Sequence, residues 1–329
     1  DGDGAQDLLV VAPDRVEILH GDVSGTLSRR RVVVAGTFLH AQATAIPDLD
    51  GDGMDEVLVA GAVDSPRAYL WWGQAGGIPD MTPPDVIIED GDQLGMSTRP
   101  HLGHSAAAVD LNRDGHRDLV VAAPALDDAV QAPVVFVVFG NSTRAALQTT
   151  PGTLDLAASV AAMGAMRLQG PPGSQMGRCV GAWEDATPAL VVGAPRVTNG
   201  VMLDAGAAYV LRAPANAALG GFSFGLTTGA PMPLTLETVT GDSADQQLGL
   251  VVFGASVGGQ ANASLAVSSA LGPVRIYQQD MTGLLGPWLY GPNGEAVLGG
   301  ALLGDASVSL VARTGVYFGW LGGASNEVS

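Results

Sequence analysis

The sequence has little cysteine and few basic residues. Its single cysteine, Cys179, cannot form an internal disulfide bond, and there is no cysteine cluster that could bind zinc. Lysine and arginine together number 15 in 329 residues, against 33 aspartates and glutamates, so the formal net charge is -18. This charge repels phosphate backbones and anionic lipid headgroups. We therefore exclude nucleic acid as a partner.

Long apolar segments and catalytic motifs are also scarce. The longest weakly polar stretches span about ten residues, about half the length of a membrane-spanning helix. The five histidines are scattered without a His-Glu-x-x-His motif, and the chain has no phosphate-binding loop. We therefore expect no membrane-spanning segment in these residues and no enzymatic activity.

The sequence is rich in glycine and proline, with 46 and 20 residues respectively. Both exceed the average usage of about 7% and about 5%. These residues favour chain reversals, so turns should be frequent and long helices are not expected. Hydrophobic residues make up 47% of the chain, enough to fill a packed core. The composition predicts an all-β protein with its acids concentrated in a few places.

One pattern, an acid-rich loop followed by an apolar run, occurs three times near the start of the chain. Its copies span residues 1–13, 48–62 and 110–124. Three later copies keep the apolar run without the acids, at residues 189–195, 264–270 and 307–312. The six apolar runs begin 43 to 75 residues apart, at Leu8, Val57, Leu119, Leu190, Leu265 and Val308. Such spacing is typical of a repeat architecture.

Each repeat contains further β-prone segments. A second segment follows every apolar run, at residues 16–20, 68–72, 134–139, 207–211, 274–277 and 316–320. Glycine-containing stretches precede the later runs, at residues 102–109, 176–182 and 248–253. More variable segments supply a fourth strand, for example at residues 31–34, 86–88 and 234–237. Residues 156–166 are expected to form either an inserted helix or an outer strand.

This order predicts a β-propeller of four-stranded antiparallel blades. A single four-stranded sheet cannot cover its own faces, and a ring of sheets packed against their neighbours solves that problem. Two unrelated β-sandwiches would not explain why the same order recurs along the whole chain. We count six blade units in one domain that covers residues 1–329.

The acidic loops carry oxygen ligands at alternating positions of a nine-residue pattern, which suits Ca²⁺. The second acidic loop (residues 48–56) offers the carboxylates of Asp48, Asp50, Asp52 and Glu56 and the carbonyl of Met54. The third acidic loop (residues 110–118) offers Asp110, Asn112, Asp114, Asp118 and the carbonyl of His116. The first acidic loop (residues 1–7) retains Asp1, Asp3, Asp7 and the carbonyl of Ala5, and its first ligand is expected before the start of this sequence.

Two other interpretations of these loops were weighed. An EF-hand shares the first half of the pattern, but it needs a glutamate at position 12 and flanking helices, whereas an apolar strand follows here. Ordinary Asp-Gly turns would account for one copy. Several carboxylates within nine residues, repeated three times, would repel one another without a counter-ion. The pattern thus predicts Ca²⁺ in the second and third acidic loops and a further ion in the first.

The repeats resemble FG-GAP repeats, the blades of the integrin α-subunit N-terminal β-propeller and of many microbial surface proteins. Two segments carry the resemblance, LGHSAAAVDLNRDGHRDLVVAAP at residues 102–124 and VVGAP at residues 191–195. The resemblance extends over the whole chain. Integrin-type rings usually have seven blades, so a seventh blade or the closing strands would lie outside this sequence or in a partner chain.

The resemblance implies a noncatalytic, calcium-stabilised scaffold, outside the cell or at its surface, that binds a protein or a glycan. Two alternatives stay open: a subunit of a surface filament or multiprotein complex, and an enzyme, or its accessory domain, acting on polysaccharides or phosphodiesters. Trp71 and Trp72 are expected to pack between blades rather than to form a carbohydrate platform. The chain opens without a signal peptide, which would make it a mature or trimmed product, and its alanine- and glycine-rich composition favours a bacterial source.

Overall fold

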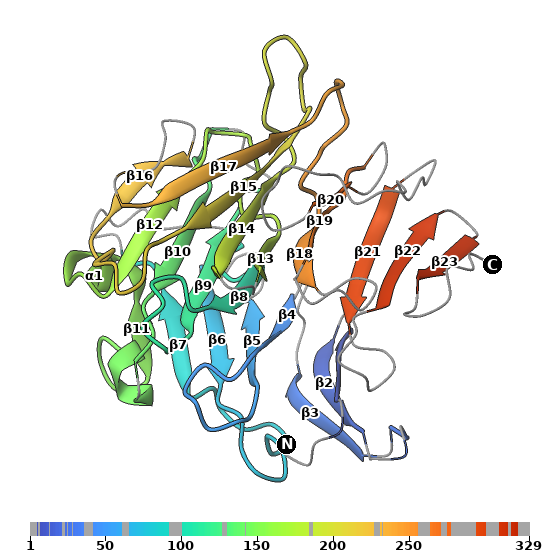
Figure 1. Cartoon of the computed structure of the whole chain (residues 1–329). Coiled ribbons are helices and arrows are strands. Elements are labelled where there is room, and N and C mark those ends of the chain that lie inside the picture. The colour runs from blue at the N-terminus through green and yellow to red at the C-terminus, as the bar shows by residue number, and fades with distance from the viewer. Residues whose placement is uncertain are drawn as a thin grey trace. The chain divides into compact units, whose positions relative to one another are not determined.

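Figure 1 shows the computed structural model of the chain. It describes residues 5, 7–12, 14–21, 24, 26–27, 29–35, 42–60, 66–91, 101–126, 130–141, 143–183, 187–226, 231, 233–255, 264–270, 275–277, 294–300, 309–314 and 317–321. The chain forms two compact units, which are described separately. Unit 1 comprises residues 1–127, 134–168 and 215–223, and unit 2 comprises residues 128–133, 169–214 and 224–329.

Nearly all regular structure in the described ranges is β. They contain 23 strands, one α-helix, α1 (Leu156–Ala161), and one 3-10 helix (Arg144–Leu147). The predicted all-β class is confirmed. No helix among these residues is long and apolar enough to cross a membrane.

Unit 1 contains three sheets. The first has the order β1-β2-β3, with β1 (Leu8–Ala12), β2 (Arg15–His20) and β3 (Arg29–Ala35). The second has the order β11-β7-β6-β5-β4, with β4 (Ala43–Ile46), β5 (Glu56–Ala60), β6 (Arg67–Trp71), β7 (Val86–Glu89) and β11 (Thr153–Asp155). The third has the order β16-β12-β10-β9-β8, with β8 (Ser105–Val109), β9 (Asp118–Ala123), β10 (Val134–Val138), β12 (Ala165–Gln169) and β16 (Ser223–Gly225).

Unit 2 also contains three sheets. One has the order β13-β14-β15-β17, with β13 (Val180–Trp183), β14 (Ala189–Ala194), β15 (Ala207–Arg212) and β17 (Thr235–Thr240). The next has the order β18-β19-β20, with β18 (Val252–Ala255), β19 (Ser264–Val267) and β20 (Arg275–Tyr277). The last has the order β21-β22-β23, with β21 (Gly294–Gly300), β22 (Ser309–Thr314) and β23 (Tyr317–Leu321).

Five of the six apolar runs form equivalent strands, as predicted. The strands β5, β9, β14, β19 and β22 each lie second in their sheet, between two antiparallel neighbours. Every residue of β5, β9 and β14 is buried, which explains why these runs lack the polar alternation of a half-exposed strand. The first run, β1, is half-exposed and lies at the edge of its three described strands.

Neighbouring sheets within each unit pack face to face. On β5, Val57 and Val59 belong to a core cluster with Val16 of the first sheet, whereas Leu58 belongs to a cluster with Phe136 of the third. The two faces of one strand therefore serve two different neighbours, as period-two alternation requires. In unit 2, Trp183 of β13 and Leu265 of β19 share a core cluster in the same way.

First strands of successive sheets also lie against each other. In unit 1, β4 contacts both β1 and β8, and in unit 2, β13 contacts β18. In the pairs β4 and β8, and β13 and β18, the contacting strands are those that precede the buried apolar run, whereas β1 is itself the apolar run of the first sheet.

The strand number differs from the uniform four that the sequence predicts. Only the sheet of β13, β14, β15 and β17 has four strands, and three sheets have three among the residues described. Two sheets of unit 1 have five, because β11 pairs in parallel with β7 and β16 is added beside β12. The ambiguous segment at residues 156–166 holds both expected elements: α1, capped by the Asp155 side chain, and then the start of β12.

Candidate metal centre

The second and third acidic loops join the first and second strands of their sheets. The second loop connects β4 to β5, where Ile46 pairs with Glu56, and the third connects β8 to β9, where Val109 pairs with Asp118. The ninth residue of each loop is therefore the first residue of the buried central strand. The preceding positions form a turn that begins and ends at a fixed place in the sheet.

The two loops share a frame of hydrogen bonds from backbone amides to acidic side chains. Position 1 accepts from position 6: Gly53 N donates to Asp48 Oδ1 and Gly115 N to Asp110 Oδ2, both at 3.0 Å. Position 5 accepts from position 7 at 2.9 Å, from Met54 N to Asp52 Oδ1 and from His116 N to Asp114 Oδ1. Position 9 accepts from position 2, from Leu49 N to Glu56 Oε2 at 2.7 Å and from Leu111 N to Asp118 Oδ2 at 2.9 Å.

The glycine at position 6 allows this frame to close. Gly53 and Gly115 have φ angles of +84° and +92°, in the left-handed region that other residues rarely adopt. Their amides point back at the carboxylate of position 1, as the hydrogen bonds above show. Glycine at position 6 therefore permits the turn in both loops.

The carboxylates at position 9 are fully buried. Glu56 and Asp118 each have a relative exposure of 0%. Burial raises the pKa of Glu56 to about 8 and that of Asp118 to about 7, against the lowering effect of the amide hydrogen bonds that each accepts. A cation beside these groups would favour their ionised form. The structure thus places a buried acid at the base of each loop.

The carboxylates of the second loop converge. One oxygen each from Asp48, Asp50 and Asp52 lie within 4.8 Å of one another. Below them, Glu56 Oε1 is buried and accepts no hydrogen bond in the described part of the chain. These oxygens form a donor set without nitrogen or sulfur, which is the set that a hard divalent cation prefers.

The third loop is arranged differently at position 3. Asn112 takes the place of an acid, and its Nδ2 donates to Asp114 Oδ2 at 2.9 Å. Both oxygens of the buried Asp118 accept amide hydrogen bonds, since its Oδ1 accepts from Gly140 N at 2.9 Å and its Oδ2 accepts from Leu111 N. The carbonyls of Met54 and His116 belong to half-buried residues whose amides complete the frames of their loops.

The first acidic loop is only partly within the described residues. Asp1 and Asp3 lie outside them, whereas Ala5 and Asp7 are described. Asp7 Oδ1 accepts from Gly21 N at 3.0 Å, and Asp7 Oδ2 lies 3.1 Å from His20 Nδ1. The bond from Gly21 to Asp7 repeats the bond from Gly140 to Asp118, so position 9 accepts from an equivalent glycine in both loops, although Asp7 is exposed and Asp118 is buried.

Sequence reasoning missed the glycine that covers each acidic loop. A Cβ on Gly73 would lie 2.7 Å from the Asp55 carbonyl oxygen, and one on Gly140 would lie 2.0 Å from that of Arg117. No other residue fits so close to the loop backbone. The signal was present in the repeats, because Gly21, Gly73 and Gly140 all follow the strand after the apolar run by one or two residues.

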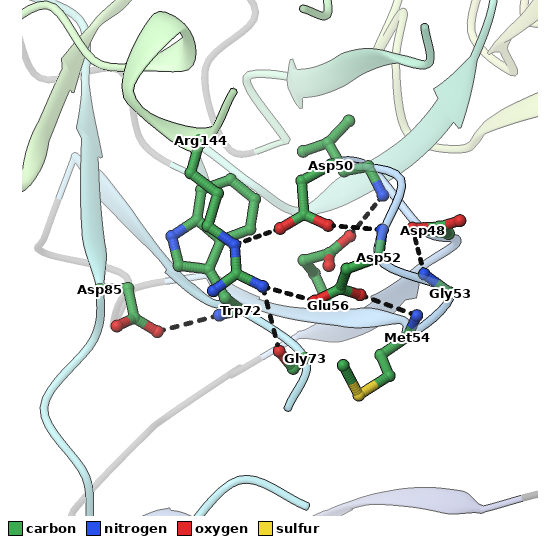
Figure 2. Close-up of polar contacts among 11 residues, drawn as sticks. Asp48, Asp50, Asp52, Gly53, Met54, Glu56, Trp72, Gly73, Asp85 and Arg144 are labelled. Atoms are coloured by element: carbon green, nitrogen blue, oxygen red, sulfur yellow. Dashed lines mark hydrogen bonds and ion pairs between the residues drawn. The ribbon is translucent and has the colours of Figure 1, made fainter. Parts of the chain in front are cut away.

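Sequence reasoning also missed Arg144, which Figure 2 shows beside the second acidic loop. Its Nη2 lies 2.6 Å from Asp52 Oδ2, its Nε donates to Asp50 Oδ2, and its guanidinium carbon lies 5.2 Å from the centre of the Trp72 ring. Arg144 is 92 residues from Asp52 along the chain, so no local pattern points to this contact.

Two further features were considered as functional sites: the tryptophan pair at residues 71 and 72, and a serine motif. Trp71 and Trp72 are 2% and 5% exposed, so they pack in the core as predicted and form no sugar platform. A Gly-x-Ser-x-Gly pattern occurs at residues 254–258, where β18 ends. Such a serine acts as a nucleophile when it lies on a strand-to-helix turn of a hydrolase sheet. Here the strand belongs to an antiparallel sheet, and Ser256 lies outside the described residues.

Comparison with known proteins agrees with the repeat pattern. A family model described as an FG-GAP-like repeat matches residues 1–59 and 48–121. Phosphatidylinositol-glycan-specific phospholipase D from Rattus norvegicus is 34% identical over 115 residues, which cover 33% of this chain and 13% of that protein. The Homo sapiens protein of the same name is 28% identical over 178 residues, which cover 52% of this chain and 19% of that protein.

The chain thus spans less than a fifth of the length of these curated relatives. Among solved structures, the crystal structure of BBS1N in complex with ARL6DN aligns with 95% of this chain and 86% of that chain. The identity is 14% and the TM-score is 0.44.

Proposed function

Because residues 1–121 match the FG-GAP-like repeat, we propose that the chain is a noncatalytic, calcium-stabilised β-propeller scaffold that binds a protein or a glycan at a cell surface or outside the cell. The observation that carries this proposal is the repeated hydrogen-bond frame of the second and third acidic loops, each with a buried carboxylate at position 9, together with the converging carboxylates of the second loop. The same frame occurs twice, at equivalent places in two sheets, which supports a shared role for the two loops.

Sheet packing supports the propeller. The second sheet of unit 1 packs against the first sheet through one face of β5 and against the third through the other. Successive sheets of a propeller pack in this way, and their first strands lie against one another as β4 does against β8. Six sheets are described.

Calcium fits the donor set of the second loop. Asp48, Asp50, Asp52 and Glu56 would supply carboxylate oxygens and Met54 a carbonyl, and the buried Glu56 Oε1 is available to a cation. In the third loop the ligands would be Asp110, Asn112, Asp114, Asp118 and the carbonyl of His116. In the first loop they would be Asp1, Asp3, Asp7 and the carbonyl of Ala5. The ion would act by neutralising carboxylates that otherwise repel one another.

A scaffold role is supported by what the loops lack. Each position-9 carboxylate of the second and third loops is buried and accepts a hydrogen bond from a loop amide, so solvent and a substrate do not reach it directly. The rim that such loops form suits adhesion to another protein or to a glycan. An exported location fits this role, because millimolar free calcium outside cells saturates sites of moderate affinity. A subunit of a surface filament or multiprotein complex is the assembled form of the same role.

A second candidate function is an accessory domain beside a phosphodiester-acting catalytic domain. The similarity to phosphatidylinositol-glycan-specific phospholipase D over up to 178 residues favours it. In this case the chain would position a catalytic partner and would not itself turn over substrate.

Calcium titration and binding screens together test the proposal. Isothermal titration calorimetry of chelator-treated protein should show two or three ions bound per chain. Glycan and protein arrays probed in calcium and in EDTA should show binding that depends on calcium. Absence of bound calcium would overturn the metal assignment. Phosphodiester or polysaccharide turnover by the purified chain, lost in a single-residue variant that still folds, would overturn the noncatalytic scaffold.

A further inference from the structure

The second acidic loop already holds a cation from another part of unit 1. Arg144 lies in the 3-10 helix after β10, and its guanidinium contacts Asp50 and Asp52 together. Its Nη2 also donates to the Gly73 carbonyl at 3.3 Å, and the Trp72 ring lies beneath it. Four groups therefore converge on one positive charge.

The atoms that Arg144 contacts are the ones that an ion would need. In both aspartates the Oδ1 atom accepts an amide hydrogen bond of the loop frame, from Asp52 N to Asp50 and from Met54 N to Asp52. The Oδ2 atoms are left for a cation, and Arg144 contacts these two. Figure 2 shows the guanidinium on the open side of the two carboxylates, with Glu56 behind them.

The second acidic loop has no basic residue of its own, which explains why its carboxylates pair with an arginine that is distant in sequence. Residues 48–56 contain five acids and no basic residue. Residues 110–118 contain three acids together with Arg113 and Arg117. The third loop thus carries basic residues within its own sequence, whereas the second must obtain its counter-charge elsewhere. Repulsion among close carboxylates weakens a fold unless an opposite charge lies near.

The Arg144 side chain can move away from the second acidic loop while the backbone of its 3-10 helix stays in place. Its side chain is 42% exposed, so it can rotate into solvent, whereas Leu147 at the end of the same 3-10 helix is 3% exposed and anchors the backbone. A cation–π contact with Trp72 and an exposed ion pair are each modest in strength. A divalent ion that satisfies the same oxygens with twice the charge can displace them.

We propose that Arg144 is an internal competitor for the cation of the second acidic loop. Without metal its guanidinium neutralises Asp50 and Asp52. A divalent ion binds there only when the guanidinium withdraws, so the affinity of this loop is lower than its own carboxylates would give. The proposal rests on the proposed calcium site, and it adds a residue outside the ligand pattern that sets the affinity of that site.

The test compares R144M with the wild-type chain and with R212M. Arg212 is a matched control in unit 2: its guanidinium carbon lies 4.6 Å from the Trp183 ring centre and its Nη1 lies 3.2 Å from Glu237, with no acidic loop nearby in sequence. Each variant is titrated with Tb³⁺, whose emission Trp72 can sensitise at the second loop, and then with Ca²⁺ in competition. The D114A background weakens the third loop so that the second is measured.

R144M should raise the affinity of the second loop for Ca²⁺ roughly tenfold, because one positive charge beside the ion is removed. It should also lower the Tm of the metal-free protein while enlarging the upward shift of Tm that Ca²⁺ produces. A merely structural role would lower Tm in both conditions alike. R212M should change neither the affinity nor the calcium shift. R144Q provides a second neutral variant if R144M folds poorly.

Unchanged affinity and an unchanged calcium shift in R144M and R144Q, with ions still bound in the wild type, would overturn the competitor role and leave the calcium site standing. No ion bound by any variant would overturn the calcium site itself and the competitor role with it.

Discussion

The β8–β9 hairpin of unit 1 and the β13–β14 hairpin of unit 2 have equivalent strand pairing and different connections. Residues 110–117 link Val109 to Asp118 in the first, and residues 184–188, which lack the acidic pattern, link Trp183 to Ala189 in the second. Both central strands are buried at every residue. The strand pairing therefore forms with or without an acidic loop. The acidic loop adds a cluster of carboxylates to a sheet that does not need it in order to form.

The two units also differ in the acceptor that binds the amide of a closely packed glycine that follows a strand. In unit 1, Gly140 N donates to the buried carboxylate of Asp118. In unit 2, Gly241 N donates to the Gly206 carbonyl at 2.9 Å, so a backbone oxygen replaces the carboxylate. Both glycines leave about as little room, since a Cβ on Gly241 would lie 2.0 Å from the Ala205 carbonyl oxygen. Of these two described contacts, the one in unit 1 depends on a charge, and the following predictions test that dependence.

The largest effect is expected from Gly140→Ala. The new Cβ would lie 2.0 Å from the Arg117 carbonyl oxygen, so the loop or the strand must shift. We expect the free energy of unfolding to fall by about 3 kcal/mol or more, measured by denaturant titration. Gly164→Ala is the matched control, because its Cβ would meet Ser159 O at 3.6 Å, an ordinary contact. Equal losses in the two variants would contradict the close packing of glycine on the acidic loop.

Asp118→Ala should follow in size. It leaves the amides of Leu111 and Gly140 without their acceptor, and an unsatisfied buried amide costs about 1–3 kcal/mol. Asp118→Asn keeps one acceptor oxygen and should lose less. Chemical denaturation in EDTA measures both variants without any contribution from metal. If alanine and asparagine were equally tolerated there, the carboxylate would not hold the frame.

Removal of calcium should have a smaller effect, confined to the acidic loops. A site with a Kd of about 0.1 mM contributes about 1.4 kcal/mol at about 1 mM free Ca²⁺. EDTA should therefore lower Tm visibly, and Asp50→Ala or Asp114→Ala should each remove part of that difference. Asp204→Ala, in unit 2 and outside any acidic loop, should leave it unchanged. Identical melting curves in EDTA and in excess Ca²⁺ would contradict the metal assignment.

Much of the fold was predictable because the signals are local. Apolar runs such as residues 119–123 and the segments after them are strands in all six repeats, since burial on both faces selects valine, leucine and alanine. The fifth strands were not predictable. β11 has only three residues, and its parallel pairing with β7 is decided by the path of residues 143–152 rather than by its own sequence.

The candidate site divides in the same way. The ligand spacing and the turn at Gly53 follow from nine consecutive residues, so they could be read from the sequence. Arg144 reaches Asp50 across 94 residues, and this contact depends on how the second and third sheets pack. The close approach of Gly140 to the loop also depends on tertiary packing, although its recurrence after equivalent strands was a usable signal.

The smallest effect is expected from Asn112→Asp, which gives the third loop the acid that the second has at position 3. In EDTA the variant loses the hydrogen bond from Asn112 Nδ2 to Asp114 and adds repulsion between two carboxylates. We expect the free energy of unfolding to fall by about 0.5–1 kcal/mol there. In millimolar Ca²⁺ the sign should reverse, because a fourth carboxylate strengthens the site. Thermal melts in EDTA and in Ca²⁺ measure this change of sign, with Asn199→Asp in unit 2 as the control. A loss of equal size in EDTA and in Ca²⁺ would show that position 3 of the third loop does not face an ion.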